Sequence, residues 1–275
     1  MIYRVYIPRP PLSNFVEMFW FYGAYAPPHA KERVLPNGSM ELIVSLRDDD
    51  GLRAYDQRDM GRSRSLGGCV VTGARSGFNI VDTAGQAPSM GVHFKPGGAF
   101  PFFGFPAGEL RDAHVPLEAV WGAAARELRD RLLEARPPES GFRILEQALL
   151  TRASRPLERH PAVSLALADF WSVPHARTIS ETIERSGLSR KRFIKLFRDE
   201  VGQTPKLFSR IRRFQELLCI IESGRRVDWA ELALMCGYFD QAHFIHDFRE
   251  FSGLSPGSYL ARRGEHPNHV VLPGD

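Results

Sequence analysis

The sequence predicts an α+β chain of two domains: an N-terminal β-barrel or sandwich with attached helices, and a C-terminal all-α domain with two helix-turn-helix units. Two observations lead to this fold class. Residues 1–118 contain short β-rich runs separated by prolines and glycines. The C-terminal part contains one pattern of residues twice, at helical spacing. With 275 residues, 43% of them hydrophobic and 25% charged, the chain is long enough to form two cores.

Five runs in residues 1–118 have the composition of strands. They lie at 17–25, 40–46, 69–72, 78–82 and 89–94. The segment 48–51, three aspartates and a glycine, predicts a turn. Four phenylalanines follow the last run and either cover the mouth of a barrel or fill its core: Phe100, Phe102, Phe103 and Phe105. We expect them in the core, because aromatic clusters are core far more often than ligand cages.

Helical spacing replaces the β pattern after Pro116. Apolar residues at 117–133 form one stripe, which predicts a helix, and those at 142–149 form a second. The two helices either pack within the chain or pair between the two copies of a homodimer. A short helix is expected at 162–171, so that residues 119–177 form a helical connector between the domains.

One pattern of five residues occurs twice in the C-terminal part. The two copies are Phe193, Phe197, Gly202, Pro205, Phe208 and Phe244, Phe248, Gly253, Pro256, Tyr259. The gaps are four, five, three and three residues in both copies. Such an echo indicates two copies of one supersecondary unit, which we call the first unit (178–213) and the second unit (214–263).

Each unit has the signals of two short helices joined by a turn. In the first unit, Thr178 or Ser180 can begin a helix that Gly187 ends, and Ser189 can cap the next helix. In the second unit, Asp240 is the predicted cap. Two short helices with a glycine turn, the second of them amphipathic, describe a helix-turn-helix unit.

The two units differ in charge. The first has ten Lys and Arg against four Asp and Glu, a balance of +6, whereas the second has five against seven, a balance of −2. The whole chain has a net charge of +4, so its basic surplus lies in the units. A basic outer helix face is either a solvated surface or a phosphate-contacting one. Because the pattern is duplicated with its phase kept, we favour DNA contact.

The segment 178–263 resembles the DNA-binding domain of the AraC/XylS family of bacterial transcription regulators. The resemblance depends on "GLSRKRFIKLFRDEVGQTPKLF" and "ELALMCGYFDQAHFIHDFREFSGLSPGSYL". It implies that a long helix, from Pro205 to about Ser223, joins the units, and that their second helices enter successive segments of the major groove. The residues that would contact DNA are Arg190, Lys191, Ile194, Lys195, Arg198, Gln241, Ala242, His243, His246 and Arg249. Among these, Arg198 and Arg249 are the candidates for the phosphate backbone.

Three residues depart from the family pattern. Ile183 stands where the family usually has a small residue, at the crossing of the two helices. His246 stands at a position often held by Arg. Ile194 can make only apolar contacts, for example with a thymine methyl group. These departures concern the preferred DNA sequence rather than the class of protein.

The N-terminal half resembles the cupin-like β-barrel sensor domain that accompanies such DNA readers in some regulators. The resemblance depends on "RVLPNGSMELIVSL" and "GVHFKPGGAFPFFGFPAGEL". It implies a sensor of a small-molecule effector and names no ligand. A metal-dependent cupin needs two histidines one residue apart, a carboxylate and a third histidine. Since His93 stands alone, we expect it to be a hydrogen-bonded structural residue, and we expect no metal, cofactor or catalytic residue.

The remaining features are ordinary ones. Cys69, Cys219 and Cys236 share no metal-ligand spacing, and each is expected to be a buried, reduced thiol. The start has no signal-peptide pattern and no apolar run has membrane-spanning length, so we expect a cytoplasmic location. Residues 264–275 are expected to form a loose polar tail.

These patterns favour a sequence-specific DNA-binding transcription regulator, not an enzyme, controlled by a small molecule in the N-terminal domain. Its expected partners are double-stranded DNA, a small-molecule effector and a second copy in a homodimer, with no membrane. Two alternatives stay open. One is a small-molecule or metal-dependent enzyme built on the barrel, with a DNA-binding tether. The other is a constitutive DNA-binding protein whose barrel serves assembly. The patterns do not distinguish an activator from a repressor.

Overall fold

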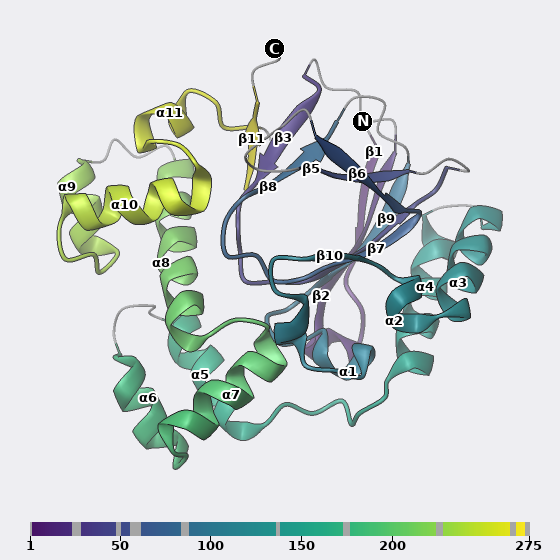
Figure 1. Ribbon diagram of the computed structural model, residues 1–275, viewed down its shortest axis with the longest axis horizontal. Helices are drawn as coiled ribbons and strands as arrows, with labels where there is room; N and C mark the ends of the chain where they lie inside the picture. Colours follow the sequence, from purple (N-terminus) through teal and green to yellow (C-terminus); the bar gives the residue numbers. More distant parts are fainter. Residues whose placement is uncertain are drawn as a thin grey trace.

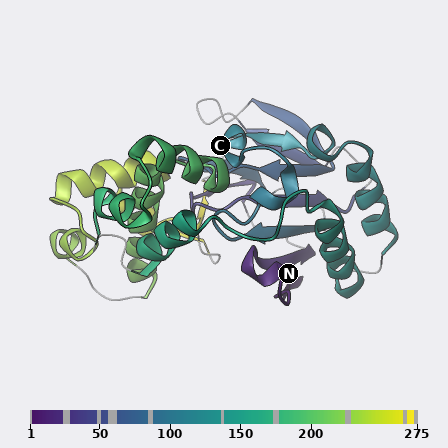
Figure 2. The same cartoon turned by 90° about the horizontal axis from the view of Figure 1, so that it is seen from below.

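The computed structural model describes residues 2–23, 29–47, 51–55, 62–83, 88–135, 138–172, 177–223, 228–264 and 268–272 (Figure 1). A β-rich N-terminal domain and a helical C-terminal domain lie side by side (Figure 2). The last described strand returns from the C-terminal domain to the N-terminal one, so the chain crosses between the domains twice.

Among the described residues, three antiparallel sheets form the N-terminal domain. The largest has the strand order β1 (Ile2–Tyr6), β2 (Val16–Gly23), β9 (Ser89–Phe94), β4 (Glu41–Ser45), β7 (Cys69–Thr72) and β10 (His114–Pro116). The second has the order β11 (His269–Val271), β3 (Lys31–Val34) and β8 (Asn79–Asp82). The third pairs β5 (Leu52–Tyr55) with β6 (Ser63–Gly67). Short 3-10 turns are η1 (Leu12–Asn14) and η2 (Ala107–Leu110).

One face of the six-stranded sheet carries the main core. Phe19, Leu42 and Val92 are fully buried there, under four helices. These helices are α1 (Phe100–Phe103), α2 (Glu118–Trp121), α3 (Ala123–Glu134) and α4 (Glu139–Arg152). Successive residues of a strand point to opposite faces, so the alternate positions lie on the other side of the sheet. Part of that side is only half-buried, and we call this part the inner face: Trp20, Tyr22, Glu41 and His93.

The phenylalanines that follow β9 belong mostly to this core. Phe102 and Phe103 are buried, and Phe105 packs against them at the edge of the cluster. Phe100 instead lies under the guanidinium of Arg155, which is 4.5 Å from the centre of its ring. The expectation of core filling is therefore confirmed for Phe102 and Phe103 and wrong for Phe100.

All five predicted strands are present. The runs 69–72 and 89–94 match β7 and β9 residue for residue, and β2, β4 and β8 begin within one residue of the other three. The predicted turn residues 48–50 lie outside the described part of the chain. Strands β1, β3, β5, β6, β10 and β11 were not predicted. Most of them, such as β3 with its sequence Lys-Glu-Arg-Val, lack the apolar alternation that makes a strand recognisable.

The helices after Pro116 differ from the prediction in one place. The stripe at 117–133 is divided into α2 and α3 at Gly122, whose φ of 60° and ψ of −136° favour glycine. A single continuous helix was therefore the wrong prediction. The stripe at 142–149 lies in α4, and its apolar residues, together with those of α3, are buried in the core of the N-terminal domain. Both apolar stripes therefore pack within the chain.

The C-terminal domain has two cores joined by one long helix. Its helices are α5 (Pro161–Ser172), α6 (Ile179–Ser186), α7 (Arg190–Val201), α8 (Pro205–Glu222), α9 (Trp229–Met235), α10 (Gln241–Ser252) and α11 (Pro256–Leu260). Phe193 and Phe197 lie in the first core, with α5, and Phe244 and Phe248 lie in the second. The predicted short helix at 162–171 and the long joining helix are confirmed as α5 and α8.

The cores divide the predicted connector, 119–177, between the two domains. Helices α2, α3 and α4 share a core with the six-stranded sheet, whereas α5 shares a core with α6, α7 and α8. We therefore propose domain bounds of 2–152 and 161–264 in place of 1–118 and 178–263.

The described part of the C-terminal tail is ordered, contrary to the prediction of a loose tail at 264–275. Strand β11 pairs with β3, and the Leu272 N–H donates to the Lys31 carbonyl at 3.0 Å. Val270 is buried in the core of the second unit. A strand of three residues gives no local signal, since its partner strand is more than two hundred residues away in the chain.

Two of the three cysteines are buried and the third is exposed. Cys69 and Cys236 are buried as expected, and burial raises the pKa of each thiol to about 12. Cys219 is exposed on α8, so the expectation of a buried thiol was wrong for it. Within the described ranges, no helix combines the length and the apolar character that crossing a bilayer requires.

Candidate nucleic-acid interface

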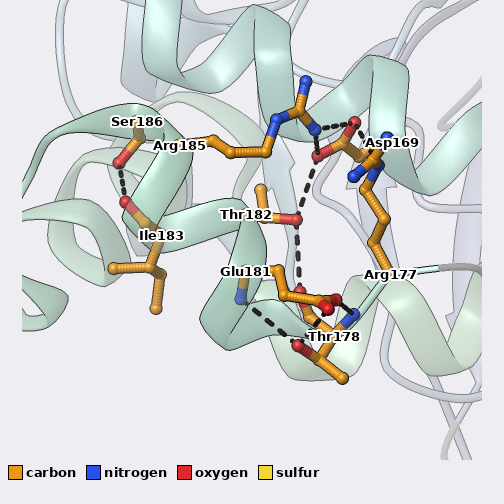
Figure 3. A network of polar contacts seen from close by, with 8 residues as sticks. All are labelled: Asp169, Arg177, Thr178, Glu181, Thr182, Ile183, Arg185 and Ser186. Carbon is orange, nitrogen blue, oxygen red and sulfur yellow. Dashed lines mark hydrogen bonds and ion pairs between the residues drawn. The ribbon is translucent and has the colours of Figure 1, made fainter.

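The first unit begins at a capping box (Figure 3). Thr178 Oγ1 accepts a hydrogen bond from the Glu181 N–H at 3.2 Å, and Glu181 Oε2 accepts one from the Thr178 N–H at 2.7 Å. Both bonds satisfy backbone groups that have no partner within the helix. Thr178, rather than Ser180, is therefore the cap of α6. The helix ends as predicted at Gly187, in the left-handed conformation.

Asp169 ties α5 to the first unit (Figure 3). Its carboxylate accepts hydrogen bonds from Thr182 Oγ1 at 3.1 Å and from Arg185 Nη1 at 2.6 Å. Arg177 Nε lies 3.6 Å from the same carboxylate. Because Asp169 is on α5 and its partners lie on α6 or just before it, the network fixes the angle between these helices.

The second helix of each unit is capped in the same way. Ser189 Oγ accepts from the amide three residues further on at the start of α7, and Asp240 Oδ1 does so at the start of α10. Gly202 and Gly253 end the two helices in the left-handed conformation. The structure thus confirms both predicted caps. The cap positions and end positions match between the units, as the repeated pattern indicates.

The two sides of α7 differ as the sequence predicts. Phe193 and Phe197 are buried against α5 and α8. On the opposite side Lys191 is exposed, and the Lys195 side chain is 76% exposed. Lys195 Nζ contacts the Asp199 carboxylate one turn further along. A pair between exposed groups contributes little stability, so this ammonium is available to another anion.

Arg198 lies where the outward side of α7 meets the N-terminal domain. Its side chain is exposed, but its stem rests on η2, where a methyl group added at Gly108 would come within 2.9 Å of Arg198 Cγ. Ile194 is partly buried at the border of the helix, and Arg190 is exposed in its first turn. Lys191, Lys195 and Arg198 therefore form a row along one side of α7.

Helix α10 has fewer charges on its outward side. Gln241, Ala242 and Arg249 are exposed, and the His246 side chain is 75% exposed. His246 Nε2 lies 3.6 Å from a Glu250 carboxylate oxygen. His243 is partly buried, with its ring 5.3 Å from that of Tyr238. Eight of the ten predicted DNA-contact residues are thus exposed, and the other two, Ile194 and His243, border the same surfaces.

A buried ion pair orients α10 on the long helix α8. Arg210 Nη2 lies 2.6 Å from Asp247 Oδ1, and the Arg210 guanidinium also contacts the Glu250 carboxylate. The Asp247 side chain is only 1% exposed. Neither residue was predicted to matter, although Asp247 interrupts the apolar side of α10 between Phe244 and Phe248. A charge at such a position indicates a partner on a neighbouring element.

Glu200 is buried at the end of α7, beside the junction of the domains. It is 5% exposed, and it accepts a hydrogen bond from the His160 N–H at the start of α5. Burial raises its pKa to about 7, against the opposing effects of the His160 N–H and of Arg159. Arg159 in turn lies 5.2 Å from the ring of Phe15 in the N-terminal domain.

Replacing Glu200 by Gln is expected to flatten the dependence of stability on pH. Between about pH 4.5 and pH 7 the folded chain keeps a proton on Glu200 that the unfolded chain has released, so stability from this group falls as pH rises. The loss reaches at most about 3 kcal/mol at 1.36 kcal/mol per pKa unit. Urea unfolding of both proteins below and above this window measures it. An exposed control, Glu184→Gln, should keep the wild-type profile, and a wild-type profile in E200Q would contradict the assignment.

Two families of domains match this chain. A family described as a helix-turn-helix domain matches residues 183–262, and a family described as a domain of unknown function (DUF6597) matches residues 4–116. The first match covers α7 and α10 entirely and most of the two units. The second covers the strands from β2 to β10.

Two of the curated relatives that match are described as transcriptional regulators. The chain is 31% identical over 81 residues to an uncharacterized HTH-type transcriptional regulator of Haemophilus influenzae, covering 30% of this chain and 27% of that protein. It is 24% identical over 119 residues to the probable transcriptional regulator LumQ of Photobacterium leiognathi, covering 42% and 46%. The matches span less than half of each relative's length.

Among solved structures, ToxT from Vibrio cholerae is similar in part. The TM-score is 0.44 at 9% identity, with 88% of this chain and 98% of that chain covered.

Proposed function

We propose that this chain is an AraC-type regulator, with a C-terminal helix-turn-helix domain joined to an N-terminal domain. In this proposal the chain binds a specific double-stranded DNA sequence and thereby controls transcription. The observation that carries the proposal is the pair of matched helices, α7 and α10. Each is capped at its start, ended by a left-handed glycine, buried along its phenylalanines and exposed on its polar side. The family match over 183–262 supports it.

The two helices would contact DNA by different means. The exposed cations of α7, above all Lys191 and Lys195, suit phosphate contacts, which give affinity that falls with salt. On α10 the exposed polar groups are mainly Gln241 and His246, which suit hydrogen bonds to base edges. Arg249 and Arg198 stand beside these positions, where phosphates flank the groove. We propose the cytoplasm as the place of action, because the proposed target is double-stranded DNA.

The N-terminal domain is proposed to bind a small-molecule effector on its inner face. The Trp20 ring lies across the backbone of β9 at Gly91, where an added methyl group would be 2.3 Å from that ring. The Glu41 side chain is 35% exposed beside it, and Glu41 Oε1 contacts His93 Nδ1 at 2.7 Å. A flat aromatic surface next to hydrogen-bonding groups is the composition of a small-molecule site.

The charges of Glu41 and His93 balance one another. Burial opposes charge on both, but their hydrogen bond prevails: it lowers the pKa of Glu41 and raises the pKa of His93. His93 is therefore a hydrogen-bonded structural residue, as expected.

Selection of binding sites from random duplexes with the full-length chain tests the proposal. We expect a motif with two parts, because two helices contact the groove. Replacing His246 by Ala is expected to relax the base preference in one part only, by about 1–3 kcal/mol at the affected position, since one base contact is removed. An unchanged thermal unfolding midpoint would exclude a folding defect. No enrichment with the wild-type chain would overturn the proposed function, and an unchanged motif with H246A would remove His246 from it.

A further inference from the structure

The C-terminal turns of both outward helices rest on the N-terminal domain. Helix α7 ends at Gly202, where an added methyl group would lie 3.4 Å from the Ala107 carbonyl oxygen of η2. Helix α10 ends at Gly253, where an added methyl group would lie 2.6 Å from the Phe78 ring, just before β8. The N-terminal turns of the same helices, with Lys191 and Gln241, are exposed. The N-terminal domain therefore holds each helix at its C-terminal end, away from the first turn that is proposed to enter the groove.

Arg33 of β3 makes the most specific of these contacts. Its Nη1 donates to the Ser252 and Gly253 carbonyl oxygens, each at 3.3 Å. The last carbonyls of an α-helix have no partner within the helix, and a cation there also interacts favourably with the helix dipole. The Arg33 guanidinium is 4.7 Å from the centre of the Phe78 ring, which lies beside Gly253. A strand of the N-terminal domain thus supplies the cap at the end of α10.

The neighbouring residue on β3 points the other way, into the N-terminal domain. Glu32 is buried, and its two oxygens contact His29 Nε2 at 2.5 Å and His269 Nδ1 at 2.6 Å. Its charge also contributes to the raised pKa of Tyr22 on the inner face, after burial and Tyr3. Adjacent residues of one strand therefore face opposite sides, Glu32 into the N-terminal domain and Arg33 towards the end of α10.

Two glutamines on the C-terminal side complete the junction. Gln203, in the turn between α7 and α8, donates to the Arg75 carbonyl at 2.7 Å. Gln215 on α8 donates to the Pro36 carbonyl at 2.8 Å, just beyond the end of β3. The first unit, the joining helix and the second unit are each bonded to the N-terminal domain at a separate point.

We propose that Arg33 is a positioning residue for DNA recognition, and that β3 and η2 of the N-terminal domain set the distance between the two parts of the DNA site. The inference rests on the proposed function and adds to it. Helix α8 packs against both α7 and α10, and η2 and β3 contact the C-terminal ends of the same two helices. A displacement of β3 moves the end of α10, so β3 connects the N-terminal domain to the DNA-binding surface.

A series of duplexes that differ only in spacing tests this. The full-length chain is titrated with its selected site and with versions that carry one or two extra base pairs between the two parts. One base pair shifts the second part by about 3.4 Å along the duplex, and we expect the wild-type chain to lose about tenfold or more in affinity per insertion. In Arg33→Gln the cap of α10 is lost, so the penalty per insertion should fall to about threefold or less.

Arg4→Gln is the matched control. Arg4 is exposed on β1, an edge strand of the six-stranded sheet, whereas β3 belongs to the three-stranded sheet, and the change in charge is the same. It should keep the wild-type spacing profile. If R33Q does not fold, Arg33→Lys, which keeps the charge but not the planar fork, is measured with the same expectation.

The outcomes are distinct. A wild-type spacing profile in R33Q, or a uniform loss of affinity at every spacing, would overturn the inference, because a positioning role acts on spacing. A wild-type chain that binds none of the duplexes would instead overturn the proposed function.

Discussion

The double replacement Lys191→Ala and Lys195→Ala is expected to weaken binding to the selected DNA site by roughly 10- to 100-fold at physiological salt. Both side chains are exposed on the outward side of α7, and Lys195 is held only by a surface pair with Asp199. Each lost phosphate contact also removes one released counterion. The slope of log affinity against log salt concentration should therefore fall by about 2.

The measurement is a titration at several salt concentrations, with a control of equal charge change. Arg126 and Arg143 are exposed on α3 and α4 of the N-terminal domain, far from α7. Replacing both by Ala should leave affinity and slope close to those of the wild type. Equal losses in the two double variants would mean that overall charge, and not the position of the lysines, governs binding. Unchanged affinity in the lysine variant would remove α7 from the DNA-binding surface.

Replacing Asp247 by Ala is expected to lower the free energy of unfolding by about 3 kcal/mol. The Asp247 carboxylate is 1% exposed and pairs with Arg210 at 2.6 Å, so its loss leaves a guanidinium among apolar side chains, including Phe251. The expected loss lies at the lower end of the usual range because Arg210 keeps Glu250 as a partner. DNA recognition by the second unit should also weaken, since the Arg210–Asp247 pair orients α10 on α8.

The free energy of unfolding is measured by chemical denaturation, and a variant of an exposed ion pair serves as the comparison. Asp199→Ala removes the partner of the exposed Lys195 and should cost less than about 1 kcal/mol. The double variant D247A with Arg210→Met should recover part of the loss, because it no longer leaves an unpaired charge buried. A loss in D247A no larger than that in D199A would show that the pair does not hold the second unit.

The predictions that succeeded rest on local chemistry. The caps Ser189 and Asp240, and the glycines that end the helices, follow from residue types that satisfy free backbone groups at helix ends. The buried phenylalanines follow from helical spacing, which the repeat shows twice. Strand β7 was found because it is a short run of apolar and β-branched residues, and β9 because Met90, Val92 and Phe94 alternate with other residues.

The features that were missed depend on partners distant in the chain. Strand β3 is charged and β11 has three residues, so neither has a local strand signal. Each is a strand because of its partners: β3 pairs with β8 and β11, and β11 pairs with β3. The tie between Asp169 and α6, which places α5 in the C-terminal domain, needs the packing of the helices. The break at Gly122 is local, but the apolar stripe continued through it and concealed it.

The sequence predicted the residues of the candidate DNA-contact surface, but it did not predict the residues that hold α10 in place. All ten predicted contact residues lie on or beside the outward sides of α7 and α10. Arg33, Arg210 and Asp247, which hold α10 in place, were not singled out. Arg33 and Arg210 lie outside α10, so the spacing of residues within α10 could not indicate them. Asp247 did carry a signal, since a carboxylate within an apolar helix side requires a nearby cation.

The account depends on α7 and α10 meeting the same side of one duplex, and a hydroxyl-radical footprint of the full-length chain on its selected site tests that most directly. We expect two protected segments whose centres lie about 10 base pairs apart, with only one of them lost in the Lys191 and Lys195 double variant. A single protected segment, or two on opposite sides of the duplex, would contradict it.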